Sequence, residues 1–305
     1  MIDFKTIQLL DREIINSFLE NYQHQGCDFC FTNLFAWQPK YKTSFTIIQN
    51  TLFIRFLDSE LNNLCYQIPI GKMNLKHSLQ MIIDDAKENN INLIIKNITK
   101  EMWAEINEVM PNTFQYQNDR DNADYIYLSQ RLINLTGRKL QSKRNHINHF
   151  KIENPNWKYF PLSTIEDIED CSKMLDNWED MNIHKAQQSL RYDYIATKAM
   201  LDNFHSLQLK GGAIRVNDKI IAFAIGEPLT ADTFVVHVEK AVNGYNGAYT
   251  IINQQFAEHE ASKFLYINRE EDMGFEYLRK AKMSYHPDLL LEKMVLTLEQ
   301  VNIVK

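Results

Sequence analysis

The sequence has few of the residues that usually divide a chain into separate pieces. It holds 9 glycines and 7 prolines among 305 residues, and no segment is rich in proline, glycine or serine. Segments of that kind form the flexible linkers between independent domains. The length exceeds one average domain and suits two of ordinary size. We therefore expect two halves that pack against each other without a linker.

Long apolar runs are also missing. The longest uninterrupted run extends from Ile220 to Ile225, far short of the ~18–20 residues that cross a bilayer as a helix. The first residues, 1–5, lack the basic and apolar regions of a signal peptide. We therefore expect a cytoplasmic, soluble protein with no integral membrane segment.

Cysteine is scarce, and its spacing is incomplete for a metal. The four cysteines include one Cys-x-x-Cys pair, Cys27 and Cys30, without a second pair at similar spacing. A structural zinc site needs four ligands, so no metal site is predicted. A thioredoxin-type pair is the alternative. We interpret Cys27 and Cys30 as small, reduced core residues.

Apolar periodicity predicts a mixed α/β fold in two halves of the same plan. Residues 65–95 and 234–267 each show a strand, a loop, a helix and a second strand, and a further helix follows. The boundary is placed near 128–136, where a strand ends and a basic helix begins. We predict domains at 1–130 and 131–305 with sheets related by a pseudo-repeat.

Acidic residues are absent from one stretch of an acidic protein. The net charge is −6, yet no aspartate or glutamate lies between Asp124 and Glu153. The predicted helix in this stretch carries Lys139 and Lys143 one turn apart, followed by Arg144. We predict that these three side chains bind a phosphate or carboxylate group. A solvated helix face is the alternative.

A glycine turn follows the predicted strand 233–239. Gly244 and Gly247 precede Ala248, which opens a helix. A helix start after a glycine turn offers free backbone N–H groups to an anion. The turn lacks the Gly-Lys-Ser/Thr of a Walker loop and the third glycine of a Rossmann fingerprint. An anion cradle is therefore predicted, with a plain tight connection as the alternative.

Polar side chains follow the next predicted strand, 264–267. Asn268, Arg269 and Glu270 stand directly after it. Ligands in open α/β sheets bind at the carboxyl ends of strands. These three residues are therefore predicted to bind substrate.

The strand 233–239 contributes His237 and Glu239, which alternation would place on one face. Glu239 is a candidate general base, and His237 a candidate substrate ligand. The alternative is a structural network of ion pairs that joins Arg269, Glu270 and Lys240.

Two segments carry motifs that resemble a known family. Residues 125–151 combine a tyrosine-containing strand with Gly-basic-basic and Lys-Arg-Asn-x-Ile-Asn-x-Phe; residues 234–287 hold Val-Glu-Lys-Ala, Tyr-x-Gly-Ala-Tyr and Asn-Arg-Glu-x-Asp-x-Gly. These motifs are similar to the C-terminal domain of phosphatidylglycerol lysyltransferases. The resemblance implies two tandem GNAT-like (acyl-CoA N-acyltransferase-like) folds. In the GNAT loop Arg/Gln-x-x-Gly-x-Gly/Ala, Gly247 matches, whereas Gly244 and Tyr249 depart from the pattern.

The resemblance implies transfer of an acyl or aminoacyl group to an amine or hydroxyl. Glu239 would help deprotonate the nucleophile, and Tyr285 would protonate the leaving group. The cleft would lie where strands 233–239 and 264–267 diverge. The donor is phosphate-bearing, and both acyl-CoA and aminoacyl-tRNA are compatible. The alternative is an inert binding module for an anionic ligand; a Glu239 locked in an ion pair within a filled slot would favour it.

Overall fold

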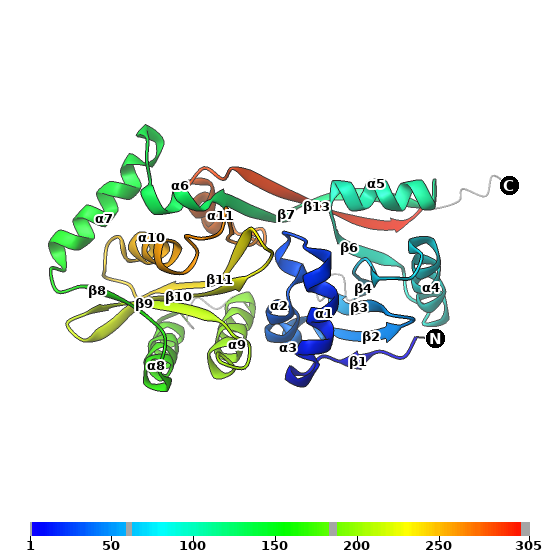
Figure 1. The fold of residues 1–305 in the computed structure, drawn as a ribbon, viewed down its shortest axis with the longest axis horizontal. Helices are drawn as coiled ribbons and strands as arrows, with labels where there is room; N and C mark the ends of the chain where they lie inside the picture. The colour runs from blue at the N-terminus through cyan, green and yellow to red at the C-terminus, as the bar shows by residue number, and fades with distance from the viewer. Residues whose placement is uncertain (1, 59–62, 183–187, 300–305) are drawn as a thin grey trace. The chain divides into compact units, whose positions relative to one another are not determined.

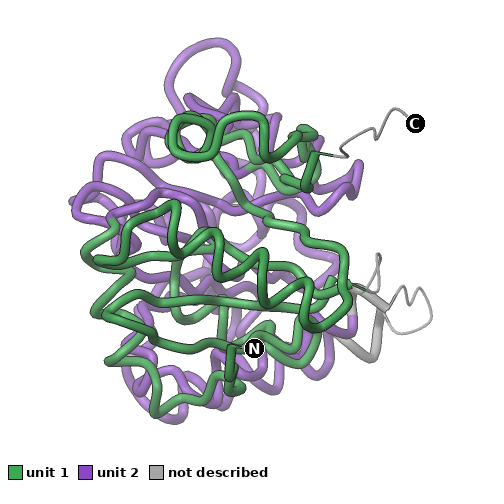
Figure 2. Tube along the Cα trace, turned by 90° about the vertical axis from the view of Figure 1, so that its right-hand side faces the viewer, with its two compact units in different colours: residues 1–22, 28–123, 291–305 green, residues 23–27, 124–290 purple. Residues whose placement is uncertain are grey.

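The computed structural model describes residues 2–58, 63–182 and 188–299. The mixed α/β class predicted from the sequence is confirmed: helices and a mixed set of strands alternate along the chain. The chain forms two compact units, coloured separately in Figure 2. The first contains residues 1–22, 28–123 and 291–305, and the second contains residues 23–27 and 124–290.

The first unit is built on a largely antiparallel sheet. Its strand order is β1-β2-β3-β4-β6-β13, with β5 paired to β3, and only β4 and β6 run parallel. Buried aromatic and β-branched residues on β2 and β3 explain the strand preference there. The strands are β1 (Lys5–Thr6), β2 (Ser44–Ile48), β3 (Thr51–Asp58), β4 (Asn63–Tyr66), β5 (Ile70–Gly71), β6 (Ile94–Ile98) and β13 (Leu289–Leu298).

The helices of the first unit, except the short α3, each bury apolar side chains. In α1, Ile15, Phe18 and Leu19 are buried at helical spacing. The side chain of Asn74 accepts from the backbone N–H of His77 and so caps the start of α4. The helices are α1 (Arg12–Tyr22), α2 (Phe31–Ala36), α3 (Gln38–Tyr41), α4 (Leu75–Glu88) and α5 (Lys100–Val109).

The strands of the second unit follow the order β7-β12-β11-β10-β9-β8, and β7 belongs to this unit from residue 124 onward. All neighbours are antiparallel except β11 and β12, which run parallel. The strands are β7 (Phe114–Leu128), β8 (Lys158–Pro161), β9 (Lys210–Val216), β10 (Lys219–Pro228), β11 (Thr233–Ala241) and β12 (Tyr266–Asn268).

Helices cover both faces of the second sheet, as Figure 1 shows. Helices α6, α7 and α10 lie on one face, and α8 and α9 lie on the other. The core under α10 includes the fully buried Phe234 and Phe256, whose ring centroids are 5.8 Å apart. The helices are α6 (Ser129–Asn134), α7 (Gln141–Glu153), α8 (Ile165–Asn182), α9 (Gln188–Asp202), α10 (Ala248–Glu260) and α11 (Glu276–Met283).

The predicted repeat of strand, helix, strand and helix is present in both units. It consists of β4-α4-β6-α5 in the first unit and β11-α10-β12-α11 in the second, and the two strands run parallel in each. The final strand of each half pairs outside its own half: β13 pairs with β6, and β7 pairs with β12. Residues 291–298 therefore belong to the first unit, which periodicity along the sequence does not reveal.

Within residues 2–58, 63–182 and 188–299, no helix combines the length and the apolarity that crossing a bilayer requires.

Candidate functional site

A β-bulge in β11 decides where Glu239 points. Between Val236 and Val238 the register with β10 shifts by one residue, which leaves His237 as an extra residue. The regular alternation of side chains is interrupted at this point. His237 and Glu239 therefore lie on opposite faces of the sheet, contrary to the shared face predicted from simple alternation.

Glu239 faces α10. Its Oε1 accepts a hydrogen bond of 2.6 Å from Nδ2 of Asn253, and its Oε2 forms an ion pair with Nη2 of Arg269. The next residue, Lys240, points to the other face and pairs with Asp193 of α9. A network of ion pairs between Arg269, Glu270 and Lys240 was the alternative predicted from the sequence. In the structure, Arg269 pairs with Glu239, and Lys240 pairs with Asp193.

The parallel strands diverge where the sequence predicted a cleft. The pairing between β11 and β12 ends at Val235 and Asn268, whereas β11 continues to Ala241. Arg269 leaves β12 at this point, and its side chain reaches Glu239 on the continuing strand. The divergence thus brings residues far apart in the sequence to one place.

Two cations approach the ring of Tyr285 at this place. The guanidinium carbon of Arg269 lies 4.8 Å from the ring centroid, and Nζ of Lys143 lies 4.0 Å from it. Such distances allow cation–π attraction. We call Lys143, Glu239, Asn253, Arg269 and Tyr285 the Tyr285 cluster.

Burial and charge set the protonation states in the Tyr285 cluster. Burial raises the pKa of Tyr285 to about 12, so its side chain stays a phenol at neutral pH. Burial and the neighbouring charge of Arg269 lower the pKa of Lys143 to about 8. Burial also opposes the charge of Arg269, but Glu239 outweighs it and the pKa of Arg269 is raised.

Arg269 keeps one unused donor. Its side chain is 10% exposed, and its Nη1 is buried and has no hydrogen-bond partner among the described residues. A buried donor without a partner costs about 1–3 kcal/mol. Lys143, which is half-buried, lies over the same Tyr285 ring as this guanidinium.

The basic stretch divides into residues with different tasks. Arg144 donates to the carbonyl oxygens of Leu135 and Gly137, the latter at 2.9 Å, and so fixes the turn before α7. Lys139 is exposed. Of the three side chains predicted to bind an anion, Lys143 alone joins the Tyr285 cluster.

The glycine turn packs against α7. Gly247 has φ +86°, and a Cβ built on it would lie 2.5 Å from the carbonyl oxygen of His146. The N–H of Ala248 already donates to the carbonyl oxygen of Tyr245 at 3.1 Å. Gly244 has φ +96° with open space around it. The Ala248 N–H, one of the donors predicted for the anion cradle, is thus used inside the turn.

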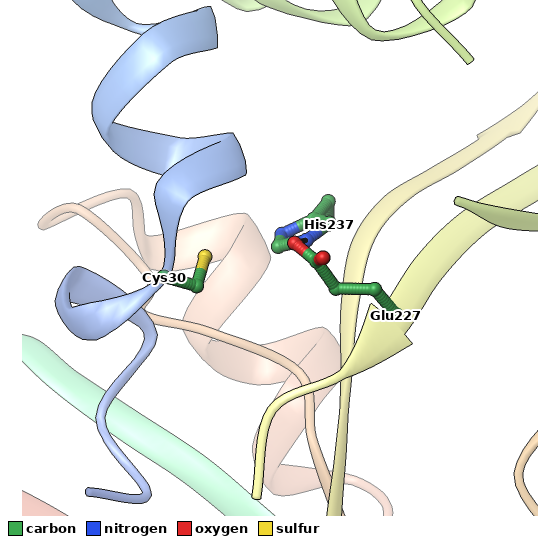
Figure 3. A group of neighbouring side chains, drawn as sticks. All are labelled: Cys30, Glu227 and His237. Atoms are coloured by element: carbon green, nitrogen blue, oxygen red, sulfur yellow. Dashed lines mark hydrogen bonds and ion pairs between the residues drawn. The ribbon is translucent and has the colours of Figure 1, made fainter. Parts of the chain in front are cut away.

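His237 lies in a closed network of charges. Nδ1 is 2.8 Å from Oε1 of Glu270, and Nε2 is 3.0 Å from Oε1 of Glu227, whose carboxyl group Figure 3 shows beside the imidazole. Burial alone would lower the pKa of His237, but the two carboxylates raise it to about 9. With its side chain 0% exposed, His237 ties two strands to the loop after β12.

Asn268 is also used inside the protein. Its Nδ2 donates to Oδ2 of Asp124 at 2.7 Å and to the carbonyl oxygen of Gln25 at 2.8 Å, and its Oδ1 accepts from the N–H of Glu270. These bonds hold the turn that presents Arg269. Of the residues predicted to bind substrate, only Arg269 lies in the Tyr285 cluster.

The sequence interpretation missed two polar contributions. Asn253 stands among buried apolar residues of α10, and a lone buried amide on such a face is a detectable signal. Cys27 is buried, but its Sγ lies 2.9 Å from Oε2 of Glu271 and 3.3 Å from Oδ1 of Asp124. It therefore belongs to a polar network, although the sequence suggested an apolar environment.

Comparison with known proteins identifies the family. The model of the C-terminal domain of phosphatidylglycerol lysyltransferases matches residues 19–296. The chain therefore belongs to this family of C-terminal domains, as its motifs suggested.

Two solved structures are similar along nearly the whole chain. A conserved protein of unknown function from Bacteroides thetaiotaomicron is 40% identical, with a TM-score of 0.91 over 98% of this chain and 100% of the other. L-PGS from Bacillus licheniformis is 14% identical, with a TM-score of 0.64 over 94% of this chain and 91% of the other, and shares the fold.

An uncharacterised protein, MYCGA3080, from Mycoplasmoides gallisepticum is 24% identical over 56% of this chain. The match spans about half (55%) of that relative.

The packing of Gly247 leads to a stability prediction. Gly247→Ala should lower the free energy of unfolding by roughly 3 kcal/mol, because the new Cβ meets the His146 carbonyl and the φ angle is unfavourable. Gly244→Ala, strained only in φ, should lose about 1 kcal/mol. Urea unfolding of both variants measures the difference. Equal losses would show that contact with α7 does not constrain Gly247.

The buried imidazolium leads to a prediction on pH. Because the folded-state pKa of His237 is raised from 6.5 to about 9, its stabilisation is complete below about pH 6.5 and disappears as the pH rises through about 9. The stability advantage of the wild type over His237→Gln should therefore shrink by roughly 3 kcal/mol between pH 6 and pH 10. Urea unfolding at both pH values tests this. An advantage of equal size at both pH values would contradict the raised pKa of His237.

Proposed function

We propose that this protein transfers an aminoacyl or acyl group to an amine or hydroxyl acceptor at the Tyr285 cluster. Membership in the phosphatidylglycerol lysyltransferase family supports the reaction class. The single observation that carries the assignment of the site is the meeting of Lys143, Arg269 and Tyr285 where β11 and β12 diverge. A positive, partly buried position of this kind favours a phosphate-bearing substrate next to a proton donor.

Tyr285 is the proposed proton donor. Its raised pKa keeps the phenol protonated at neutral pH, so it can pass a proton to the oxygen of the leaving group as the acceptor attacks the carbonyl carbon. The acceptor's own proton then restores the phenol. The cations on its ring stabilise negative charge that develops on the phenolic oxygen during this exchange.

Glu239 takes a different role from the general base predicted from the sequence. Both carboxylate oxygens are engaged, one by Asn253 and one by Arg269. A base in this position would have to release Arg269 before it could accept a proton. We assign Glu239 to the positioning of Arg269, whose second arm then faces the ligand.

Aminoacyl-tRNA is the donor we favour. Gly244 stands where the acetyl-CoA loop of GNAT enzymes has Arg or Gln, and the Ala248 N–H is used within the turn. The family name suggests a phosphatidylglycerol acceptor, and the proposed location is the cytoplasmic side, where charged tRNA is available.

The engaged carboxylate also favours a second candidate, an inert module that binds an anionic ligand. In that case the Tyr285 cluster would retain its cations for binding, and Glu239 would have no part in turnover. The ion pair between Glu239 and Arg269 is the observation in its favour. A transfer assay separates the two candidates.

Removal of the Tyr285 hydroxyl group tests the proposed transfer reaction. The full-length protein is incubated with tRNA charged with labelled amino acids and with phosphatidylglycerol vesicles, and label in the lipid and released label are measured. Tyr285→Phe keeps the ring under the two cations but removes the proton donor, so transfer should fall by about 100-fold or more.

Tyr277→Phe is the matched control, because Tyr277 is 58% exposed and lies outside the Tyr285 cluster; this variant should retain the wild-type rate. Label that stays on the tRNA with the wild-type protein, across all amino acids and with added amine acceptors, would rule out transfer and favour the binding module. Equal rates for the wild type and Tyr285→Phe would remove Tyr285 from the mechanism.

A further inference from the structure

The charges of the Tyr285 cluster do not balance. Lys143 and Arg269 are cations, and Glu239 is the carboxylate that pairs with Arg269. Within the described ranges, Lys143 makes no ion pair. The buried Nη1 of Arg269 has no hydrogen-bond acceptor there. The cluster as it stands therefore carries one uncompensated positive charge and one unsatisfied donor, and the unsatisfied donor is buried.

The position remains reachable from solvent. Lys143 is only partly buried, whereas the Arg269 side chain is 10% exposed. Lys143 is therefore the more accessible of the two cations. Glu239 and the rings of Tyr127 and Tyr285 hold Arg269 in place, so the site is built before the ligand arrives.

We infer that the Tyr285 cluster binds one singly charged phosphodiester group, with Nζ of Lys143 and Nη1 of Arg269 as its donors. The inference rests on the proposed function and specifies the substrate group at the same site. One negative charge neutralises the cluster, whereas the pyrophosphate of a coenzyme A would bring at least two.

The donors favour a phosphodiester over a carboxylate. A carboxylate binds best to two coplanar N–H groups of one guanidinium, but Glu239 already occupies one arm of Arg269. Lys143 comes from α7 and Arg269 from the loop after β12, so the two donors belong to separate elements. A tetrahedral phosphate can accept from an ammonium and from a single guanidinium nitrogen at the same time.

Binding of diethyl phosphate to the full-length protein tests the inference. Its affinity is measured by NMR titration with ¹³C-methylated lysines, which also reports the pKa of Lys143. Lys143→Met should weaken binding at least about tenfold, the effect of losing a charge-assisted hydrogen bond. Lys219→Met, at the exposed first residue of β10, should bind like the wild type. In the wild type, the pKa of Lys143 should rise on binding.

Two compounds represent natural sources of the group: sn-glycero-3-phosphoglycerol for a lipid head group and the dinucleotide CpA for the end of an RNA. Tighter binding of either, with the same dependence on Lys143, supports the inference. Binding of coenzyme A or acetate more tightly than diethyl phosphate would overturn it, as would equal affinity of the wild type and Lys143→Met for diethyl phosphate.

The charge count has a test of its own. Glu239→Gln adds one net positive charge, so the affinity for the dianion methyl phosphate should rise relative to diethyl phosphate by about tenfold. An unchanged ratio would contradict the charge argument, provided the variant keeps its circular dichroism spectrum and its methyl-lysine signals. Loss of transfer with retained phosphodiester binding would defeat only the proposed function, and transfer without such binding would defeat only this inference.

Discussion

The ion pair between Glu239 and Arg269 is the interaction on which the candidate site depends. It joins the end of β11 to the loop after β12 at the point where the two strands diverge. Removal of either partner would leave a charge in a place of low polarity, which costs several kcal/mol. The pair also fixes the orientation of the guanidinium, since Glu239 is itself held by Asn253 of α10. Everything proposed for Lys143 and Tyr285 presupposes an Arg269 that stays in this position.

The surrounding structure supports this pair from both sides of the sheet. The bulge at His237 turns Glu239 toward α10, and the buried imidazole holds Glu270, the residue directly after Arg269. Asn268, directly before Arg269, is fixed by Asp124 and by the backbone at Gln25. The polar residues around Arg269 thus form a frame for one guanidinium. This explains why the polar segment 268–270 contributes one side chain, that of Arg269, to the Tyr285 cluster.

The packing of α7 connects the basic stretch to the same site. Gly247 lets the turn before α10 approach the backbone of His146, and Arg144 holds the preceding turn by its carbonyl groups. The helix is therefore fixed at both the turn and the glycine contact, and Lys143 projects over Tyr285. A basic stretch that appears uniform in sequence separates into a structural arginine, an exposed lysine and one lysine at the site.

The sequence alone determined the fold class, the repeated order of elements and the family, because apolar periodicity and local motifs are properties of neighbouring residues. It also singled out Glu239, Arg269, Lys143 and Tyr285 as candidate site residues, a prediction that rested on polar groups near strand ends and on the family motifs. Their individual tasks were decided by tertiary structure. A one-residue bulge reversed the face of Glu239 relative to His237, and the partners of β7 and β13 were set by pairing between segments far apart in the chain. Register and long-range contact depend on packing energies that no local pattern contains.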